Sequence, residues 1–372
     1  MKINSNRETL IKGIQTIQAG VSSKTGTIPI LQNFLMETED KGLKVVFTDL
    51  EMAIKHHIPV EIKGEGSNTV PIKKFMEIVQ NLGEESEVNI SVDESSRISI
   101  HSGKSRFKLG GAPKNDYPVI PDLDESNSFK VPAKLLADMI LSTIFSASTE
   151  DDRHFLNGLL WKFEKDLFSL VATDGRRLAI ASSKKVKAKK EFKVIVPAKI
   201  LGELARYIKG AGVKDADEVT VGLSSNQIGF KLGKTVFISR LVEGNFPAYE
   251  QIIPKSHDIE LTLNAGKLMA VTKRAAICSN ERSGAVKYTF KPGALVVNSA
   301  SQSMDFEDEI ETDYKGKEFQ ISFNPKFVMD ILKAAGDNDL AAEFTSPATP
   351  ALLRLKGRED LLYIVMPLRT QG

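Results

Sequence analysis

The stretch Val194–Ile208, VIVPAKILGELARYI, places an apolar run, a proline and an amphipathic segment in direct succession. A residue before proline is pushed toward extended geometry, and proline suits the first position of a helix. After Pro197 the apolar residues recur with helical spacing, so they form one buried face. These residues are Ile200, Leu201, Leu204, Ala205 and Ile208. The stretch therefore predicts a strand that turns directly into a helix.

The same pattern recurs along the chain. Pro71, Pro132 and Pro325 also follow short apolar runs, and each is followed by a lysine within two residues. Looser copies begin near Asn6 and Asn264, where asparagine can cap a helix in place of proline. The predicted helices start near residues 6, 71, 132, 197, 264 and 325. A long, regular period of this kind sets the architecture of a protein.

Segments that alternate apolar and polar residues fill the intervals between these helices. Examples are VNISV at 88–92, GLLWKF at 158–163 and VKYTFK at 286–291. The repeated unit therefore reads as a strand, a helix and about three further strands. Because lone hairpins are only marginally stable, we expect these strands to join larger antiparallel sheets, which gives an α+β fold.

A second layer of repetition pairs the units into domains. Thr48-Asp49 and Thr173-Asp174 end corresponding strands 125 residues apart, and Asn298-Ser299 occupies the next slot. Residues 103–121 are echoed by residues 233–254, and each copy ends in a proline-punctuated, then polar, segment that is typical of a linker. We therefore predict three similar domains, 1–125, 126–255 and 256–372, each of an ordinary domain size.

Composition bounds the class of protein. The 372 residues are 41% hydrophobic and 26% charged, which is ordinary for a globular protein. The single cysteine, Cys278, excludes an internal disulfide and indicates a reducing compartment. The first residues lack the apolar core of a signal peptide, and no window approaches the length of a membrane span. We expect a cytoplasmic protein with no membrane segment.

The charge is unevenly distributed, although the formal net charge is only +2. The six predicted helical segments hold 13 basic and five acidic residues, whereas the rest of the chain holds 37 basic and 43 acidic ones. A solvated face accounts for the charge on any one helix. The same bias on six related helices instead favours a surface for a polyanion, namely nucleic acid.

Signals of catalysis are weak. The five histidines show no metal-ligand spacing, and the sequence has no phosphate-binding glycine loop, GxSxG or CxxC motif. Asp174 beside Arg176 and Arg177 could perform acid chemistry, but Thr-Asp-Gly at a strand end is chiefly a tight-turn signature. The run Lys184–Lys193, with six lysines, predicts an exposed hairpin, with auxiliary DNA contact as the alternative. We predict no catalytic residue, no metal and no cofactor.

Several segments resemble the bacterial sliding clamps, the beta subunits of DNA polymerase III. The most specific are LVATDGRRLAI at 170–180, EGNFPAYEQIIP at 243–254 and YIVMPLR at 363–369. TIPILQNFL, FTDLEMAI, DRHFLNGLLW and KRAAICSNE extend the resemblance over essentially the whole chain. The resemblance implies a DNA polymerase processivity factor: a head-to-tail homodimer of three-domain protomers, with helices lining a ring around duplex DNA and sheets outside.

Helix dimensions independently favour a dimeric ring. Helices roughly 10 Å across, set side by side, would leave a hole of about 9 Å with six helices and about 28 Å with twelve. A duplex roughly 20 Å wide needs the larger hole. Two protomers provide twelve helices, and heterologous contacts close a ring when the rotation allows.

The resemblance also implies site residues. The DNA-contacting positions are Lys24, Lys74, Arg153, His154, Phe155 and Lys199. The pocket for short clamp-binding peptides corresponds to Thr173, Gly175, Arg176, Arg177, Leu178, Pro247, Ile252, Ala348, Pro350, Ile364, Met366, Pro367, Leu368 and Arg369. The subunit interface places Phe107 against Ile277 and Cys278. Burial in the core is the alternative for Ile252, Ile364 and Phe107.

The implied partners are double-stranded DNA, a second copy of the chain, a clamp loader, replicative and other DNA polymerases, and repair proteins that carry clamp-binding peptides. Two other classes of function stay open at this point. One is an enzyme acting on nucleic acid through Asp174 or the acidic run Glu307–Glu311. Metal-dependent nuclease activity would identify it. The other is a repeat scaffold that binds only proteins, which would not stay on closed circular DNA.

Overall fold

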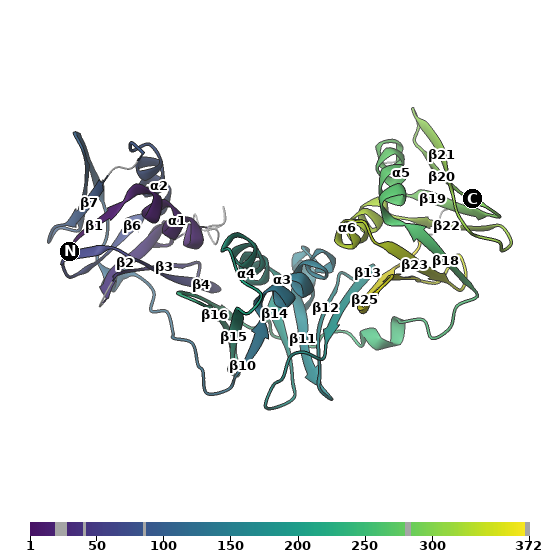
Figure 1. Cartoon of the computed structure of the whole chain (residues 1–372), viewed down its shortest axis with the longest axis horizontal. Coiled ribbons are helices and arrows are strands. Elements are labelled where there is room, and N and C mark those ends of the chain that lie inside the picture. The colour runs from purple at the N-terminus through teal and green to yellow at the C-terminus, as the bar shows by residue number, and fades with distance from the viewer. Residues whose placement is uncertain (19–27, 40–41, 85–86, 280–283, 369–372) are drawn as a thin grey trace. The chain divides into compact units, whose positions relative to one another are not determined.

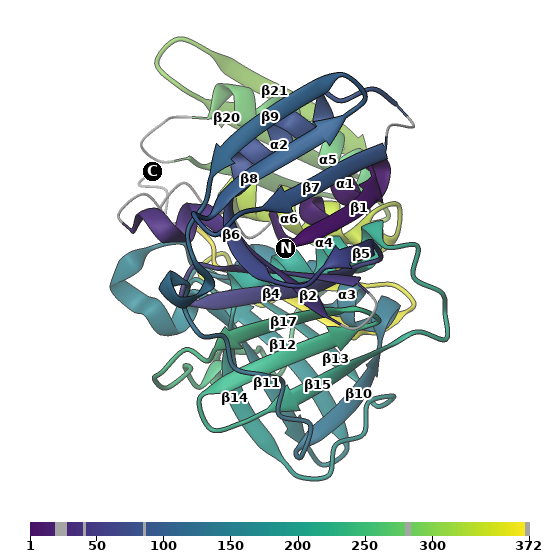
Figure 2. The same cartoon turned by 90° about the vertical axis from the view of Figure 1, so that its left-hand side faces the viewer.

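A computed structural model describes the chain except for residues 19–27, 40–41, 85–86, 280–283 and 369–372 (Figures 1 and 2). The chain forms two compact units. Unit 1 contains residues 1–134 and 199–241, and unit 2 contains residues 135–198 and 242–372. Two predicted site residues, Lys24 and Arg369, lie outside the described residues. The predicted domain boundaries near residues 125 and 255 stay a prediction.

The helices begin within one residue of the predicted starts, but Pro71, Pro132 and Pro197 end the preceding strands, and only Pro325 occupies a first helical position. Within the described residues the α-helices are α1 Arg7–Gln18, α2 Ile72–Gln80, α3 Ala133–Leu141, α4 Ala198–Gly210, α5 Ala265–Cys278 and α6 Pro325–Ala335. The side chain of Asn6 accepts a hydrogen bond from the Thr9 amide at 2.8 Å, and that of Asn264 accepts one from the Lys267 amide at 2.9 Å. Asparagine therefore caps α1 and α5, as predicted.

Unit 1 is built on two antiparallel sheets. A five-stranded sheet has the order β5-β1-β7-β8-β9, and an eight-stranded sheet has the order β10-β15-β16-β17-β4-β3-β2-β6. Strands β4 and β17 join sequence-distant halves of the larger sheet, with Ile54 opposite Phe237. The bounds are β1 Lys2–Asn6, β2 Asn33–Glu39, β3 Gly42–Thr48, β4 Met52–Ile58, β5 Glu61–Gly64, β6 Ser67–Pro71, β7 Glu87–Val92, β8 Arg97–Ser102, β9 Ser105–Gly110, β10 Ser128–Pro132, β15 Glu218–Leu223, β16 Gln227–Leu232 and β17 Thr235–Arg240.

Unit 2 repeats this plan. Its eight-stranded sheet has the order β14-β11-β12-β13-β25-β24-β23-β18, and its four-stranded sheet has the order β21-β20-β19-β22. Strands β13 and β25 join the two halves of the larger sheet, with Leu178 opposite Ile364. The bounds are β11 Gly158–Glu164, β12 Leu167–Thr173, β13 Arg177–Ser183, β14 Phe192–Pro197, β18 Ile259–Asn264, β19 Val286–Lys291, β20 Ala294–Ala300, β21 Asp305–Glu311, β22 Phe319–Phe323, β23 Asp339–Phe344, β24 Ala351–Leu355 and β25 Arg358–Val365.

The helices bury their apolar faces and expose their basic ones. Helix α1 packs against α2, β3 and β4, and α5 packs against α6, β20 and β21. All five apolar residues predicted to line the buried face of α4 are buried. Burial of each such large aliphatic side chain contributes about 1.5–3 kcal/mol. Of the 13 basic residues on the predicted helical segments, all are exposed except the half-buried Arg7.

Two features differ from the sequence predictions. Residues 184–191 do not form a hairpin, because they connect β13 to β14 and strands β11 and β12 lie between those two in the sheet. The buried Val186 anchors this connection, and the six lysines of the run are exposed. Strand β23 has the sequence DLAAEF, which contains no β-branched residue, so local sequence only weakly favours a strand here. None of the described helices is long and apolar enough to cross a bilayer.

Candidate functional site

The turn between β12 and β13 is organised by two side chains. The hydroxyl of Thr173 donates to the Arg177 carbonyl at 2.6 Å and accepts from the Gly175 amide at 3.0 Å. The Asp174 Oδ1 atom accepts from the amides of Arg176 and Arg177 at 2.9 and 3.0 Å. Gly175 has a φ of 84°, which favours glycine. The Thr-Asp-Gly segment thus forms the tight turn that the sequence predicts.

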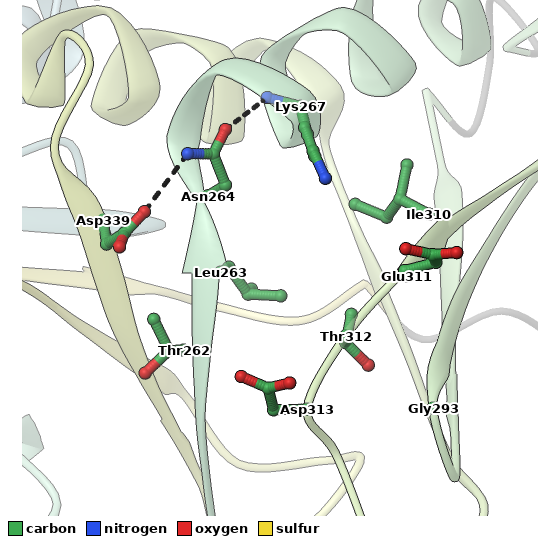
Figure 3. Close-up of a pocket in the computed structure, with 10 residues that line it drawn as sticks. All are labelled: Thr262, Leu263, Asn264, Lys267, Gly293, Ile310, Glu311, Thr312, Asp313 and Asp339. Carbon is green, nitrogen blue, oxygen red and sulfur yellow. Dashed lines mark hydrogen bonds between the residues drawn. The ribbon is translucent and has the colours of Figure 1, made fainter.

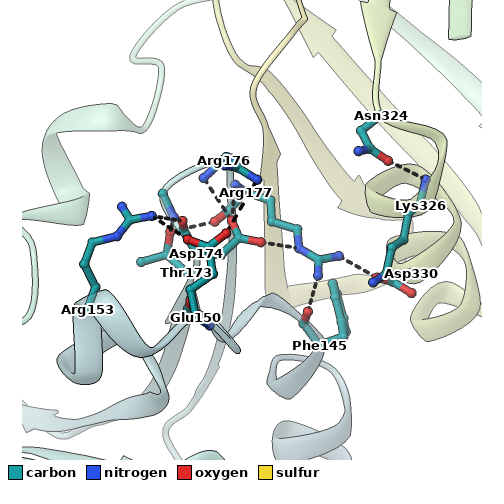
Figure 4. A network of polar contacts seen from close by, with 12 residues as sticks. Phe145, Glu150, Arg153, Thr173, Asp174, Arg176, Arg177, Asn324, Lys326 and Asp330 are labelled. Atoms are coloured by element: carbon teal, nitrogen blue, oxygen red, sulfur yellow. Dashed lines mark hydrogen bonds and ion pairs between the residues drawn. The ribbon is translucent and has the colours of Figure 1, made fainter. Parts of the chain in front are cut away.

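The Arg177 side chain links this turn to other segments of unit 2 (Figure 4). It is only 7% exposed, and its Nε atom donates to Asp174 Oδ2 at 3.0 Å while Nη1 donates to Asp330 Oδ2 on α6 at 2.6 Å. Its Nη2 atom donates to the Phe145 carbonyl, and the guanidinium lies 4.5 Å from the centroid of the Phe327 ring. The three nitrogens of the Arg177 guanidinium thus all have partners, and Phe327 lies against the group. Arg177 therefore stabilises the turn and has little capacity to bind a ligand.

Three segments that are distant in the sequence meet at this turn. Leu178 and Ile364 belong to one buried cluster with Phe246 and Tyr249 of the segment that follows β17. The Met366 amide donates to the Arg176 carbonyl at 2.9 Å and extends the β13–β25 pairing by one residue. The structure therefore brings together the three segments of the predicted peptide pocket.

The predicted pocket residues fall into two groups. Thr173, Arg177, Leu178 and Ile364 are buried. Gly175, Arg176, Pro247, Ile252 and Ala348 are exposed, and Pro350, Met366, Pro367 and Leu368 are half-buried. Ile364 is buried in the core, which was the alternative interpretation for it, whereas Ile252 is 37% exposed. The accessible members include the apolar side chains of Pro247, Ile252, Met366 and Leu368, which suit an anchor site for a peptide.

The predicted DNA-contacting residues Arg153, His154 and Phe155 lie beside this pocket. The Arg153 Nη2 atom is 3.5 Å from both Glu150 Oε2 and the Asp174 carbonyl, as Figure 4 shows. Phe155 packs against the cluster that contains Leu178, and His154 is exposed. Sequence reasoning missed this proximity because the loop and the turn are separated by a whole strand pair.

The other two described DNA-contacting candidates are on helices of unit 1. Lys74 on α2 is exposed and forms an ion pair with Glu77 at 2.8 Å. Lys199 at the start of α4 forms an ion pair with Asp49, in the turn between β3 and β4. Both lysines keep one third or more of their side chain exposed, so both remain accessible to a phosphate.

The predicted interface residues lie at accessible edges. Phe107 is on β9, an edge strand of its sheet, and is 36% exposed. Ile277, at the end of α5, is 71% exposed, and Cys278 is half-buried. Strand β21, which packs beside α5, is also an edge strand, and it holds five acidic residues, whereas β9 carries Arg106 and Lys108. The acidic run was visible in the sequence, but its position at a sheet edge was not.

A separate recess of about 630 Å³ lies at the start of α5 (Figure 3). It is lined by Lys267 and the carboxylates of Glu311, Asp313 and Asp339, and Asp339 accepts a hydrogen bond from the Asn264 side chain at 3.2 Å. None of the predicted site residues lines it. Among the described residues, no group of three His, Cys, Asp or Glu side chains is placed to hold a metal ion.

Comparison with known proteins decides the family. Sequence models of the N-terminal, central and C-terminal domains of the DNA polymerase III beta subunit match residues 1–121, 130–248 and 250–369. The chain belongs to this family. Beta sliding clamps of Haemophilus influenzae and Escherichia coli K12 are 31% and 32% identical to it over 371 residues, which is 99% of this chain and 100% of each relative.

Solved structures agree with this assignment. The sliding clamps of Bartonella birtlesii and Bacillus subtilis are 32% and 30% identical to the chain, with TM-scores of 0.93 and 0.92, and each comparison covers 100% of both chains. The resemblance seen in the sequence and the three-domain α+β fold are confirmed. Sliding clamps are non-catalytic processivity factors of DNA polymerase, and the chain is one of them rather than an enzyme.

Proposed function

We propose that the chain works as a ring-shaped homodimer that encircles duplex DNA, slides on it and tethers other proteins through the peptide pocket. The observation that carries this proposal is the exposed basic residues that all six helices present. Lys73, Lys267 and Lys326 are examples that form no ion pair with any described residue. Diffuse attraction of this kind is independent of DNA sequence and permits sliding.

The free sheet edges support the homodimer. Strand β9 is basic and β21 is acidic, and each has one side that pairs with no other strand among the described residues. Pairing of β9 in one copy with β21 in another would cover both of these sides and bring Phe107 toward Ile277. Two such heterologous contacts would close a ring.

The pocket supports the tethering role. Its rim combines Ile252, Pro247 and Met366 with the exposed Arg176, a mixture that suits a short peptide with a glutamine and spaced apolar side chains. The proposed users are a clamp loader, replicative and other DNA polymerases, and repair proteins. We propose a cytoplasmic location, because these partners act in DNA replication and repair.

Retention on DNA of different topology tests encirclement. After loading, the protein should leave linear DNA through its free ends but survive on closed circular DNA at salt concentrations that remove ordinary binders. Equal loss from linear and circular templates would contradict a ring.

Sedimentation tests the interface. Replacing Phe107 and Ile277 together by alanine should produce folded monomers, because symmetry repeats each truncation at both contacts, at about 2–5 kcal/mol for each fully buried side chain. Ile252→Ala, an apolar truncation of similar exposure away from both edges, is the matched control and should remain dimeric. An unchanged dimer in the double variant would place the interface elsewhere.

Removal of residues 366–372 tests the pocket. The truncated protein should lose binding of a fluorescein-labelled peptide with one glutamine and two spaced leucines, measured by anisotropy, because losing apolar walls costs far more than losing a rim charge. Its sedimentation should stay that of a dimer. Undiminished peptide binding would move the partner site elsewhere.

A further inference from the structure

The turn between β3 and β4 in unit 1 reproduces the turn of the peptide pocket bond for bond. The hydroxyl of Thr48 donates to the Met52 carbonyl at 2.8 Å and accepts from the Leu50 amide at 3.0 Å. The Asp49 Oδ1 atom accepts from the amides of Glu51 and Met52 at 3.1 and 2.9 Å. These are the same four bonds that Thr173 and Asp174 form.

The surroundings of this turn are also reproduced. The Arg240 amide donates to the Glu51 carbonyl at 3.1 Å, as the Met366 amide donates to the Arg176 carbonyl. Tyr117, from the segment that follows β9, is buried with Val46, and its hydroxyl accepts from the Thr48 amide at 3.2 Å. Phe246 is buried at the corresponding place in unit 2 but has no hydroxyl to make this hydrogen bond. A turn, a strand end and a proline-rich segment therefore converge in both units.

These three segments enclose a groove with a cavity of about 110 Å³. Ala53 and Ile238 face each other in its floor, where the peptide pocket has Leu178 and Ile364, so the smaller alanine leaves space. A cavity of about 150 Å³ holds a benzene ring, so this one is large enough for one aliphatic side chain. The rim is apolar and exposed, with Leu50 at 46% and Val119 at 96%.

Leu50 occupies a backbone conformation that disfavours it. Its φ is 74°, a left-handed value that costs a residue with a side chain about 1–2 kcal/mol, and the corresponding residue in unit 2 is Gly175. A large apolar side chain is thus held in strain at an exposed position, beside a cavity and a fully exposed valine. Strained backbone conformations and exposed apolar side chains are both common at ligand-binding sites.

The charges at the rim indicate what the groove would accept. Arg240 and Glu51 both line the groove and are exposed, and neither forms an ion pair with any described residue. The matching positions in unit 2 are the uncharged Met366 and the exposed Arg176, so each site has one exposed arginine but on a different segment. A ligand with an acidic side chain would complement Arg240, and the apolar rim requires aliphatic neighbours on that ligand.

We propose that this groove is a second peptide-binding site, which takes an extended segment of a partner protein with two leucine-like residues in alternate positions and an acidic residue beside them. Alternate side chains of an extended segment point the same way, so both aliphatic groups can enter between Leu50, Val119 and Ile238. The choice of a peptide as ligand rests on the proposed function of the pocket in unit 2. The choice of an acidic residue rests on Arg240.

The test uses the full chain and fluorescein-labelled Ser-Leu-Asp-Leu-Ser, with Ser-Leu-Lys-Leu-Ser as the charge-reversed probe. In an Ile252→Asp background, which removes the exposed apolar wall of the first pocket, the aspartate peptide should still bind one per chain. Arg240→Glu should weaken it by about fivefold and strengthen the lysine peptide. Leu50→Gly, which suits the local backbone and cannot strain the fold, should weaken both by about fivefold.

The outcomes separate the two sites. Loss of all peptide binding in Ile252→Asp, or binding that neither Arg240→Glu nor Leu50→Gly changes, would overturn the second site and leave the first intact. Binding that survives Ile252→Asp, responds to both unit 1 variants and switches its charge preference with Arg240→Glu would establish the second site, even if the first pocket proved inactive.

Discussion

The turn Thr48–Met52 in unit 1 and the turn Thr173–Arg177 in unit 2 share the hydrogen bonds between their threonine and aspartate side chains and the backbone. They differ in the residues that attach them to the rest of the unit. In unit 2 the last residue is Arg177, whose buried guanidinium links Asp174 to Asp330. In unit 1 the last residue is Met52, and the turn reaches a helix through an ion pair between Asp49 and the partly exposed Lys199. Threonine and aspartate set the turn locally, whereas tertiary contacts decide how rigidly it is held.

The largest expected effect comes from breaking the buried anchor. Arg177→Ala would leave the carboxylate of Asp330 without its partner, and removal of one member of a buried ion pair costs about 3–5 kcal/mol. Urea unfolding followed by Trp161 fluorescence should report this loss, because Trp161 is the only tryptophan and is buried in β11 of unit 2. Arg176→Ala, its exposed neighbour, is the control and should change the free energy of unfolding by less than about 0.5 kcal/mol. Equal effects of the two variants would contradict the assigned anchor.

A second difference lies in the strands that join the two halves of each large sheet. His56 on β4 contacts the Thr235 hydroxyl on β17 at 2.8 Å, whereas Ala181 occupies the corresponding place on β13. Burial, with a smaller contribution from His57 and Lys234, lowers the pKa of His56 to about 4. The imidazole of His56 therefore binds a proton more readily in the unfolded chain than in the folded one. The stability that the folded protein gains from keeping His56 neutral is fully present above pH 6.5 and is lost as the pH falls toward 4.

Hydrogen exchange of the β4 and β17 amides should detect this titration. Between pH 7 and pH 5 the free energy of opening in unit 1 should fall by about 1–2 kcal/mol, after correction for the intrinsic exchange rate. His56→Asn keeps a polar group near Thr235 but does not titrate, so it should lose this part of the pH dependence. A wild-type slope in the variant would assign the effect to another group.

The two left-handed positions offer a smaller test. Gly175→Ala should lower the free energy of unfolding by about 1–2 kcal/mol, because the φ of 84° disfavours a side chain and the added Cβ would lie 3.0 Å from Arg153 Nη1. Leu50→Gly should change it by less than about 1 kcal/mol, since relief of strain is offset by the freedom glycine gains in the unfolded chain. Thermal unfolding of both variants beside the wild type checks the comparison, and a stable Gly175→Ala variant would contradict it.

The smallest effect is expected at the exposed anchor. Lys199→Ala should cost no more than about 1 kcal/mol, because the lysine side chain is 37% exposed and Asp49 keeps two backbone donors. Hydrogen exchange in the β3–β4 turn gives the readout, with Lys74→Ala as the control on an ordinary surface pair. A loss as large as that of Arg177→Ala would show that the two turns are anchored equally.

The sequence alone determined the local structure of this protein. Asparagine side chains cap α1, α5 and α6, whereas proline is the last extended residue directly before α2, α3 and α4. Thr48-Asp49 and Thr173-Asp174 likewise determined their turns, since their hydroxyl and carboxylate groups bond to amides two or three residues away. The segments of the peptide pocket were found through resemblance, and their roles stay predictions.

Only the tertiary structure decided which of these residues are available. Arg176 and Arg177 are adjacent and chemically identical, yet one is exposed and the other is enclosed by Asp330, Phe145 and Phe327. Local sequence cannot distinguish them, because the enclosing groups come from segments about 30 and 150 residues away. The pairing of β4 with β17 and of β13 with β25 could not be predicted for the same reason. Pairing between distant strands depends on side-chain packing across the whole sheet, which no short stretch encodes.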